Sequence, residues 1–166
     1  MFLSRFLSRD DFGRVIQHAP LVSIDLLVRD ENERVLVGLR VNRPARGFWF
    51  VPGGRIYKDE RLDDAFRRIS QAELGRPVPR QEADLLGVYE HLYDDNALDI
   101  PEVSTHYVVI AYQLQLGAAS LQLPEGQHER FLWMDVDEIR GNAAVHPNTR
   151  AYFPERPGLL EPQTGP

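Results

Sequence analysis

The sequence contains no cysteine among its 166 residues. This absence excludes disulfide bonds, zinc–thiolate sites and cysteine nucleophiles, and it disfavours an oxidising compartment. Long apolar runs are also absent, because no stretch approaches the roughly 18 apolar residues that a membrane helix needs. Arg5 and Arg9 interrupt the apolar start of the chain, which is too short to act as a signal peptide. We therefore expect a cytoplasmic protein.

An excess of positive charge is lacking as well, because 19 basic residues face 25 acidic ones and the net charge is −6. An acidic surface disfavours binding to nucleic acid and to anionic membranes, although a local basic pocket is compatible with a phosphorylated small molecule. With 43% apolar and 27% charged residues, the composition is that of an ordinary globular protein. At roughly 100–200 residues per domain, the length predicts a single domain with its own core.

That domain is expected to span residues 1–153, followed by a poorly ordered tail at 154–166 that holds four prolines and two glycines. The patterns predict a helix from about residue 10 that ends before Pro20, and a β-hairpin over 21–41. Further strands are predicted over 48–51, 85–93, 105–116 and 131–134, and helices over 62–74 and 136–140. Because regular βαβ alternation is missing, an α+β fold, a mixed α/β sandwich, is favoured over a Rossmann fold.

The helix predicted over 62–74 has one apolar stripe and ends at Gly75. At roughly 100° per residue, the stripe contains Leu62, Ala65, Phe66, Ile69, Ala72 and Glu73. Glu73 therefore faces inward near the helix C-terminus, where desolvation and the helix dipole both disfavour a carboxylate. A metal ion or an arginine would compensate it. Alternatively, its side chain reaches solvent in a frayed last turn.

The segment from Gly54 to Gly75 resembles the Nudix hydrolase signature, G-x5-E-x7-R-E-U-x-E-E-x-G-U, in which U is an aliphatic residue. The matching positions are Gly54, Glu60, Arg68, Glu73 and Gly75. The copy is degraded, because Ile69 and Ala72 stand where that family has metal-binding glutamates, and Ser70 and Arg76 replace aliphatic residues. A site with one carboxylate in place of three is expected to hold fewer metal ions, which puts the ordinary attack of water on phosphorus in doubt.

The chain further resembles the GDP-mannose mannosyl hydrolase (GDP-mannose glycosidase) branch of that superfamily, over about residues 10–153. The stretches that carry this likeness are PLVSIDLLV, VGLRVNRPARGFWFVPGGR, the degraded helix, HLYDDN, THYVV and EGQHERFLW. The resemblance implies a Nudix fold with a mixed sheet packed between helices. It also implies one Mg²⁺ per subunit, with Mn²⁺ as an alternative, bound by the carbonyl of Gly53, the side chains of Glu73 and Gln127, and diphosphate oxygens. Ignoring the resemblance, Gln127 reads as a surface loop residue.

The resemblance also gives His128 the role of general base, for which a reference pKa near 6.5 is suitable. Arg40 and Arg55 would hold the diphosphate, as planar bidentate donors can. Arg68 would either do the same or pair with Glu60 to brace the loop against the helix. Without the resemblance, each of these side chains reads as an ordinary surface residue.

Three further residues complete the implied site. Tyr107 would donate a hydrogen bond to the leaving phosphate, although a strand tyrosine that faces the core is an alternative. Asp25 interrupts the apolar run LVSIDLLV and could bind sugar hydroxyls or offset positive charge at the anomeric carbon. An exposed sheet face is the simpler explanation of Asp25. His91 and the loop 94–96 are expected to contact the sugar or the base.

The resemblance therefore implies hydrolysis of GDP-mannose, and of GDP-glucose as a further substrate, to GDP and free hexose by water attack at C1 with inversion. Two alternatives stay open: a conventional Nudix pyrophosphatase that attacks phosphorus, and an inactive module that binds a nucleotide sugar. The implied partner is a small GDP-sugar rather than a nucleic acid or a membrane. Because members of the branch are dimers, we also expect a homodimer.

Overall fold

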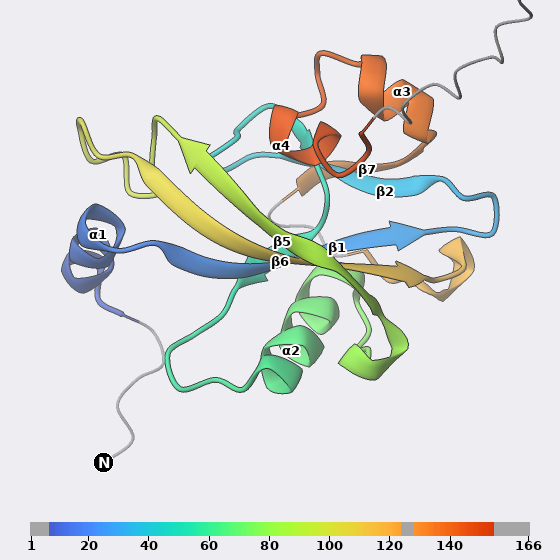
Figure 1. Cartoon of the computed structure of the whole chain (residues 1–166), viewed down its shortest axis with the longest axis horizontal. Coiled ribbons are helices and arrows are strands. Elements are labelled where there is room, and N and C mark those ends of the chain that lie inside the picture. Colours follow the sequence, from blue (N-terminus) through green and yellow to red (C-terminus); the bar gives the residue numbers. More distant parts are fainter. Residues whose placement is uncertain (1–6, 124–127, 155–166) are drawn as a thin grey trace, which may run out of the picture.

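The fold is a mixed β-sheet with helices on both faces (Figure 1), and the computed structural model describes residues 7–123 and 128–154. In the described chain the strands are β1 (Leu21–Arg29), β2 (Val35–Arg40), β3 (Trp49–Phe50), β4 (Gly53–Arg55), β5 (Asp84–Tyr93), β6 (Thr105–Gln115) and β7 (His128–Met134). The helices are α1 (Arg9–His18), α2 (Leu62–Leu74), α3 (Val136–Gly141) and α4 (Pro147–Arg150), with short 3₁₀ turns η1 (Arg80–Glu82) and η2 (Ala118–Ser120).

Strand β1 lies at the centre of the sheet and pairs in parallel with β6 along its whole length. It also pairs antiparallel with β4, where Asp25 lies opposite Gly53. The predicted hairpin over 21–41 is therefore wrong in its length. Strands β1 and β2 pair only at Arg29 and Val35, and β2 otherwise pairs with β3 and β7. The apolar run of β1 explains its position, since a strand that is buried on both faces needs apolar residues on both.

Two apolar layers enclose the sheet and confirm the predicted mixed sheet between helices. Side chains alternate along β1, so Leu26 packs in the cluster on the α2 side and Leu27 in the opposite cluster. Figure 1 shows α2 on one side of the sheet and α3 with α4 on the other. None of the described helices is long and apolar enough to span a membrane.

Helix α2 confirms the prediction for 62–74 and ends at Gly75, which has a φ of 74°. A side chain at Gly75 would overlap the backbone carbonyl of Gln122, so both the dihedral and the space require glycine. The apolar stripe differs from the prediction at Ala72, which is exposed, and at Ser70, which is fully buried. The Ser70 hydroxyl accepts a hydrogen bond from the backbone N–H of Val78, which explains how this polar side chain fits in the core.

Three local features depart from the sequence patterns. Residues 53–55 form a further strand, β4, held against β1. Strand β7 begins at 128 rather than 131, because its backbone continues to pair with β2 as far as Arg40. Residues 147–150 form a short helix, α4, which His146 caps by accepting a hydrogen bond from the N–H of Asn148. Most of the tail predicted at 154–166 lies outside the described residues.

Candidate active site

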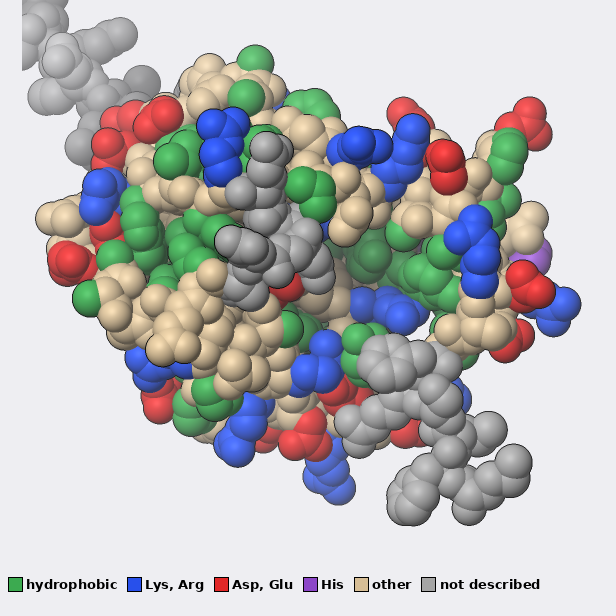
Figure 2. All heavy atoms as spheres, turned by 180° about the vertical axis from the view of Figure 1, so that it is seen from behind, with side chains coloured by type: hydrophobic (Ala, Val, Ile, Leu, Met, Phe, Trp, Pro, Cys, Tyr) green, Lys and Arg blue, Asp and Glu red, His purple; other side chains and the backbone are tan. Residues whose placement is uncertain are grey.

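A cavity of about 630 Å³ opens beside β1, β4 and α2. On the face shown in Figure 2 the surface is hollowed, and basic side chains lie inside the hollow. The predicted site residues that line this cavity are Asp25, Arg40, Gly53, Arg55, Arg68, Glu73, His91 and Tyr107. The tertiary structure therefore brings together eight residues that come from six strands and helices. A volume of this size is in the range of small-molecule sites.

Two of the predicted site residues, Gln127 and His128, are not fully described by the structure. Gln127, the proposed metal ligand, lies outside the described residues. His128 is the first residue of β7, and its backbone lies opposite Arg40 of β2 in the sheet register. Arg40 itself lines the cavity.

Glu73 is buried in the last turn of α2, with 5% of its surface exposed, so its side chain does not escape to solvent. It lines the cavity together with the backbone of Gly53. Carboxylate and carbonyl oxygens are the hard donors that Mg²⁺ prefers, and Mg²⁺ often takes its remaining ligands from water and substrate phosphates. The donors present therefore fit a single divalent ion better than a cluster of ions.

Ile69 and Ala72 line the same cavity on the helix turn that carries Glu73. Ile69 packs closely against β4, because a Cβ at Gly54 would lie 3.1 Å from the Ile69 side chain. Within residues 7–123 and 128–154, no group of three or more His, Asp or Glu side chains forms a possible metal site. The two positions at which the signature has glutamates thus present apolar groups to the cavity.

Gly53 is required by the close approach of β4 to β1. A Cβ at this position would lie 2.5 Å from Asp25 Oδ1 and 2.6 Å from the backbone carbonyl oxygen of Ile24. Any side chain would therefore displace either the carboxylate or the strand. The backbone of Gly53 and the side chain of Asp25 consequently share one wall of the cavity.

Arg68 braces the loop after β4 against α2. Its Nε donates to Glu60 Oε1 at 2.7 Å, and its Nη2 donates to Glu60 Oε2 and to the backbone carbonyl of Arg55, both at 2.8 Å. The Glu60 side chain is 1% exposed and also accepts from the N–H of Tyr57, whose ring lies 3.9 Å from the Arg68 guanidinium carbon. Of the two roles considered for Arg68, this contact is the one in which it pairs with Glu60 and braces the loop against the helix. The Arg68 side chain also lines the cavity.

Arg40, Arg55 and Tyr107 line the same cavity. The Arg40 Nε donates to the carbonyl of Pro44 at 3.0 Å, while the Arg55 guanidinium stacks on Phe12 at 4.2 Å. Burial raises the pKa of Tyr107, and the charges of both arginines act in the opposite direction. Tyr107 therefore keeps its hydroxyl proton near neutral pH and can donate it to an anionic ligand.

Asp25 is buried with 6% exposure, so it does not lie on an exposed sheet face. Burial raises the pKa of Asp25 to about 7. The hydrogen bond from Tyr152 and the charge of Arg40 lower this pKa, and the charge of Glu73 raises it. Both carboxylates line the same cavity. Tyr152, which no local sequence pattern singles out, is the main residue that the sequence analysis missed.

Two histidines near the cavity are held neutral. Burial, with a smaller contribution from His146, lowers the pKa of His91 to about 4. Burial and the charges of Arg40 and Arg150 lower the pKa of His146 to about 4 as well. Neutral imidazole is needed at His146 because its Nδ1 accepts the hydrogen bond that caps α4.

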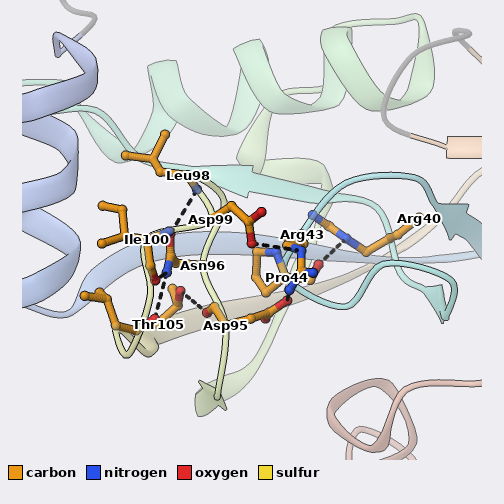
Figure 3. Close-up of polar contacts among 10 residues, drawn as sticks. Arg40, Arg43, Pro44, Asp95, Asn96, Leu98, Asp99, Ile100 and Thr105 are labelled. Atoms are coloured by element: carbon orange, nitrogen blue, oxygen red, sulfur yellow. Dashed lines mark hydrogen bonds and ion pairs between the residues drawn. The ribbon is translucent and has the colours of Figure 1, made fainter.

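Two loops, 41–47 and 94–104, meet at the mouth of the cavity (Figure 3). Arg43 joins them, because its Nη1 lies 3.0 Å from Asp95 Oδ2 and its Nε lies 3.6 Å from Asp99 Oδ1. Arg43, Arg46 and Asp99 line the cavity and were missed by the sequence analysis. In the sequence, Arg43 and Arg46 lie close to Arg40, and Asp99 lies in a polar loop. Neither feature predicts that the two loops contact each other.

Asn96 holds the second loop together rather than facing a ligand. It is 2% exposed, and its Nδ2 donates to the carbonyls of Ile100 and Val103 at 2.8 Å. Its Oδ1 accepts from the N–H groups of Leu98 and Ile100. The expectation that this part of the loop contacts the sugar or the base is thus not supported at Asn96, whose polar atoms are already used.

Replacing Glu60 with alanine is expected to lower the free energy of unfolding by about 1–3 kcal/mol, because Arg68 loses its carboxylate partner and the Tyr57 N–H loses the Glu60 oxygen as acceptor. Urea denaturation measures this change. The matched control is Asp59→Asn in the exposed Lys58–Asp59 pair, for which a change below about 0.5 kcal/mol is expected. Equal effects of the two substitutions would contradict the bracing role.

The lowered pKa of His146 predicts a loss of stability in acid. Its folded pKa of about 4 lies below an unfolded value near 6.5, so its contribution is present above pH 6.5 and is lost as the pH falls towards 4. In His146→Asn, which keeps a capping acceptor but does not titrate, the free energy of unfolding should differ less between pH 7.5 and pH 4.5. An unchanged difference between these two pH values would refute this role of His146.

Comparison with known proteins identifies the family. A model of the NUDIX domain matches residues 19–155. The low-salt glycan biosynthesis protein Agl8 of Haloferax volcanii is 40% identical over 121 residues, which cover 73% of this chain and 74% of that protein. The m7GpppN-mRNA hydrolase NUDT17 of Danio rerio is 26% identical over 129 residues, which cover 72% of this chain and 43% of that protein.

Solved structures show the same fold. A MutT NUDIX hydrolase from Burkholderia pseudomallei superimposes with a TM-score of 0.65 at 24% identity, covering 82% of this chain and 97% of that chain. The dihydroneopterin triphosphate pyrophosphohydrolase of E. coli gives a TM-score of 0.61 at 20% identity, covering 80% and 91% of the two chains. By its sequence and its fold, the chain belongs to the NUDIX family and is a Nudix hydrolase.

Proposed function

We propose that this Nudix hydrolase cleaves a GDP-hexose, GDP-mannose or GDP-glucose, to GDP and the free hexose. Water adds to the anomeric carbon C1, the bond from C1 to the diphosphate oxygen breaks, and configuration at C1 inverts. The 40% identity to a protein of glycan biosynthesis supports a nucleotide-sugar substrate. The likeness of the quoted sequence stretches to the GDP-mannose mannosyl hydrolase branch supports the choice of base and sugar.

The observation that carries this proposal is the composition of α2 where it meets the cavity. Ile69 and Ala72 face the cavity beside Glu73, at positions where the signature has two more glutamates. Attack on phosphorus in the ordinary family uses several ions gathered by those glutamates. A site with one such glutamate is better suited to stabilising a departing diphosphate than to activating water against phosphorus.

The residues that would hold one divalent ion are Gly53, Glu73 and Gln127, and Mg²⁺ or Mn²⁺ is the ion proposed. When bound, this ion supplies charge stabilisation to the diphosphate. The arginines act in the same direction, because Arg40 and Arg55 line the cavity and their positive charges act on Tyr107 in it. Tyr107 donates a hydrogen bond to the departing phosphate. No acid is required at the glycosidic oxygen, since a diphosphate with compensated charge is already a good leaving group.

His128 is proposed to remove the proton from the attacking water. Its backbone lies at the start of β7, opposite Arg40 at the cavity edge. Asp25 and His91 line the same cavity and are proposed to bind the hexose, with Asp25 offsetting positive charge that develops at C1. A small soluble GDP-sugar remains the proposed partner, and the homodimer stays a prediction.

A second candidate is the conventional reaction, attack of water on phosphorus to give GMP and a sugar phosphate. The names of two similar proteins favour it, since one is an mRNA cap hydrolase and the other a pyrophosphohydrolase. The third candidate, binding of a nucleotide sugar without turnover, predicts no product at all. The three candidates therefore differ in their products.

Incubation with GDP-mannose and Mg²⁺ in ¹⁸O-water should give GDP and mannose, with the label in mannose. Mass spectrometry of both products locates the label, and proton NMR of the first mannose released reports inversion. GMP, or label in a phosphate group, would establish attack on phosphorus instead. If GDP-mannose binds but no product forms, the protein is a binding module.

Replacing His128 with glutamine should lower kcat by about 10²–10⁴-fold, the contribution expected of a general base. His18→Gln provides the matched control, because His18 is exposed at the end of α1, and its kcat should equal that of the wild type. Steady-state kinetics of GDP release measure both variants. A His128→Gln enzyme with nearly the wild-type rate would remove the histidine from the mechanism.

A further inference from the structure

A chain of three buried polar side chains lies behind the proposed sugar end of the cavity. The Tyr152 hydroxyl donates a hydrogen bond to Asp25 Oδ2 at 2.7 Å and lies 3.2 Å from His91 Nε2. All three residues are at most 6% exposed. Asp25 and His91 line the cavity, and Tyr152 contacts both of them from the core cluster on the opposite side of the sheet from α2.

The chemistry of the hydroxyl group fixes the direction of this chain. A tyrosine hydroxyl has one proton, and when Asp25 is ionised that proton is donated to the Asp25 carboxylate. The hydroxyl oxygen can then only accept from His91, so Nε2 of His91 must carry the proton of the neutral ring. Each member of the chain is thus oriented by the next, from β5 through the segment after α4 to β1.

The two oxygens of Asp25 are held on different sides. Oδ1 faces the backbone of β4, because a Cβ at Gly53 would lie 2.5 Å from it. Oδ2 is bound by Tyr152. A carboxylate that is restrained at Oδ2 cannot rotate about its Cβ–Cγ bond without losing a buried hydrogen bond. Tyr152 therefore determines which oxygen is available to the cavity.

Tyr152 is itself rigidly placed. Its N–H donates to the carbonyl of Thr149 at the end of α4, and its ring packs edge-on against Tyr89 with centroids 4.7 Å apart. The restraint on Asp25 thus comes from a segment 127 residues further along the chain.

We propose that Tyr152 is a positioning residue that sets the orientation of the Asp25 carboxylate for its role at the sugar, with His91 orienting the Tyr152 hydroxyl. The proposal rests on the proposed function only in assigning Asp25 to the sugar. It predicts that the effect of the Tyr152 hydroxyl on the reaction depends on Asp25. The orientation itself is measurable without any substrate.

The first experiment uses ¹⁵N NMR of the full chain labelled at histidine. At a pH above 7, where Asp25 is ionised, His91 should show the tautomer protonated at Nε2. Tyr152→Phe should shift the Nε2 resonance because the acceptor is lost. Tyr89→Phe is the matched control, since it removes a hydroxyl from the neighbouring ring and should leave that resonance in place. A His91 protonated at Nδ1 alone, or equal shifts in both variants, would overturn the proposal.

The second experiment is a double-mutant cycle on hydrolysis of GDP-mannose. Tyr152→Phe should lower kcat by about 10-fold, as expected when a reacting group loses its orientation, with KM changed less than about 2-fold. In an Asp25→Ala background the same change should have no further effect, and Tyr89→Phe should leave both constants unchanged. Effects of Tyr152→Phe and Asp25→Ala that multiply would refute the positioning role.

The two experiments separate the two proposals. A wild-type protein that releases no GDP and hexose would contradict the proposed function, while the NMR experiment would still decide the orientation of the chain. If the products are GMP and a sugar phosphate, the cycle is measured on that reaction, and coupling of Tyr152 to Asp25 remains the required result.

Discussion

The burial of a carboxylate in the middle of the central strand is the constraint on which this site depends. Asp25 lies in β1 between strands that pair with it on both sides, and it is nearly inaccessible to solvent. A buried carboxylate needs hydrogen bonds and positive charge. Tyr152 and Arg40 supply them, while Gly53 is the residue that lets β4 approach closely enough to share the cavity wall.

A second buried carboxylate, Glu73, gives the cavity its chemical character. Asp25 and Glu73, the two buried acidic side chains of the cavity wall, are balanced by several arginines that line the same cavity. One of these, Arg68, is engaged by Glu60 and the backbone of Arg55, so it also maintains the shape of the loop that precedes α2. The arrangement suits a ligand that brings negative charge of its own and a divalent ion with it.

The mouth of the cavity depends on contacts between loops rather than on the sheet. Arg43 joins the loop after β2 to the loop after β5 through Asp95 and Asp99 (Figure 3). Asn96 makes four hydrogen bonds within its own loop and so links its backbone groups together. These contacts order polar groups at the entrance in the absence of a ligand, which lowers the cost of ordering them when a ligand binds.

The sequence by itself determined the local features: the bounds of α2, the end at Gly75 and the inward direction of Glu73 all follow from helical periodicity and glycine chemistry. The signature spacing also located Glu60 and Arg68, whose pairing needs only the loop and the helix between them. Only the tertiary structure decided that β1 pairs with β6 rather than mainly with β2, that Gly53 belongs to a strand, and that Tyr152 binds Asp25. These contacts join residues far apart in the chain, and no periodicity along one segment specifies which distant segment will cover it.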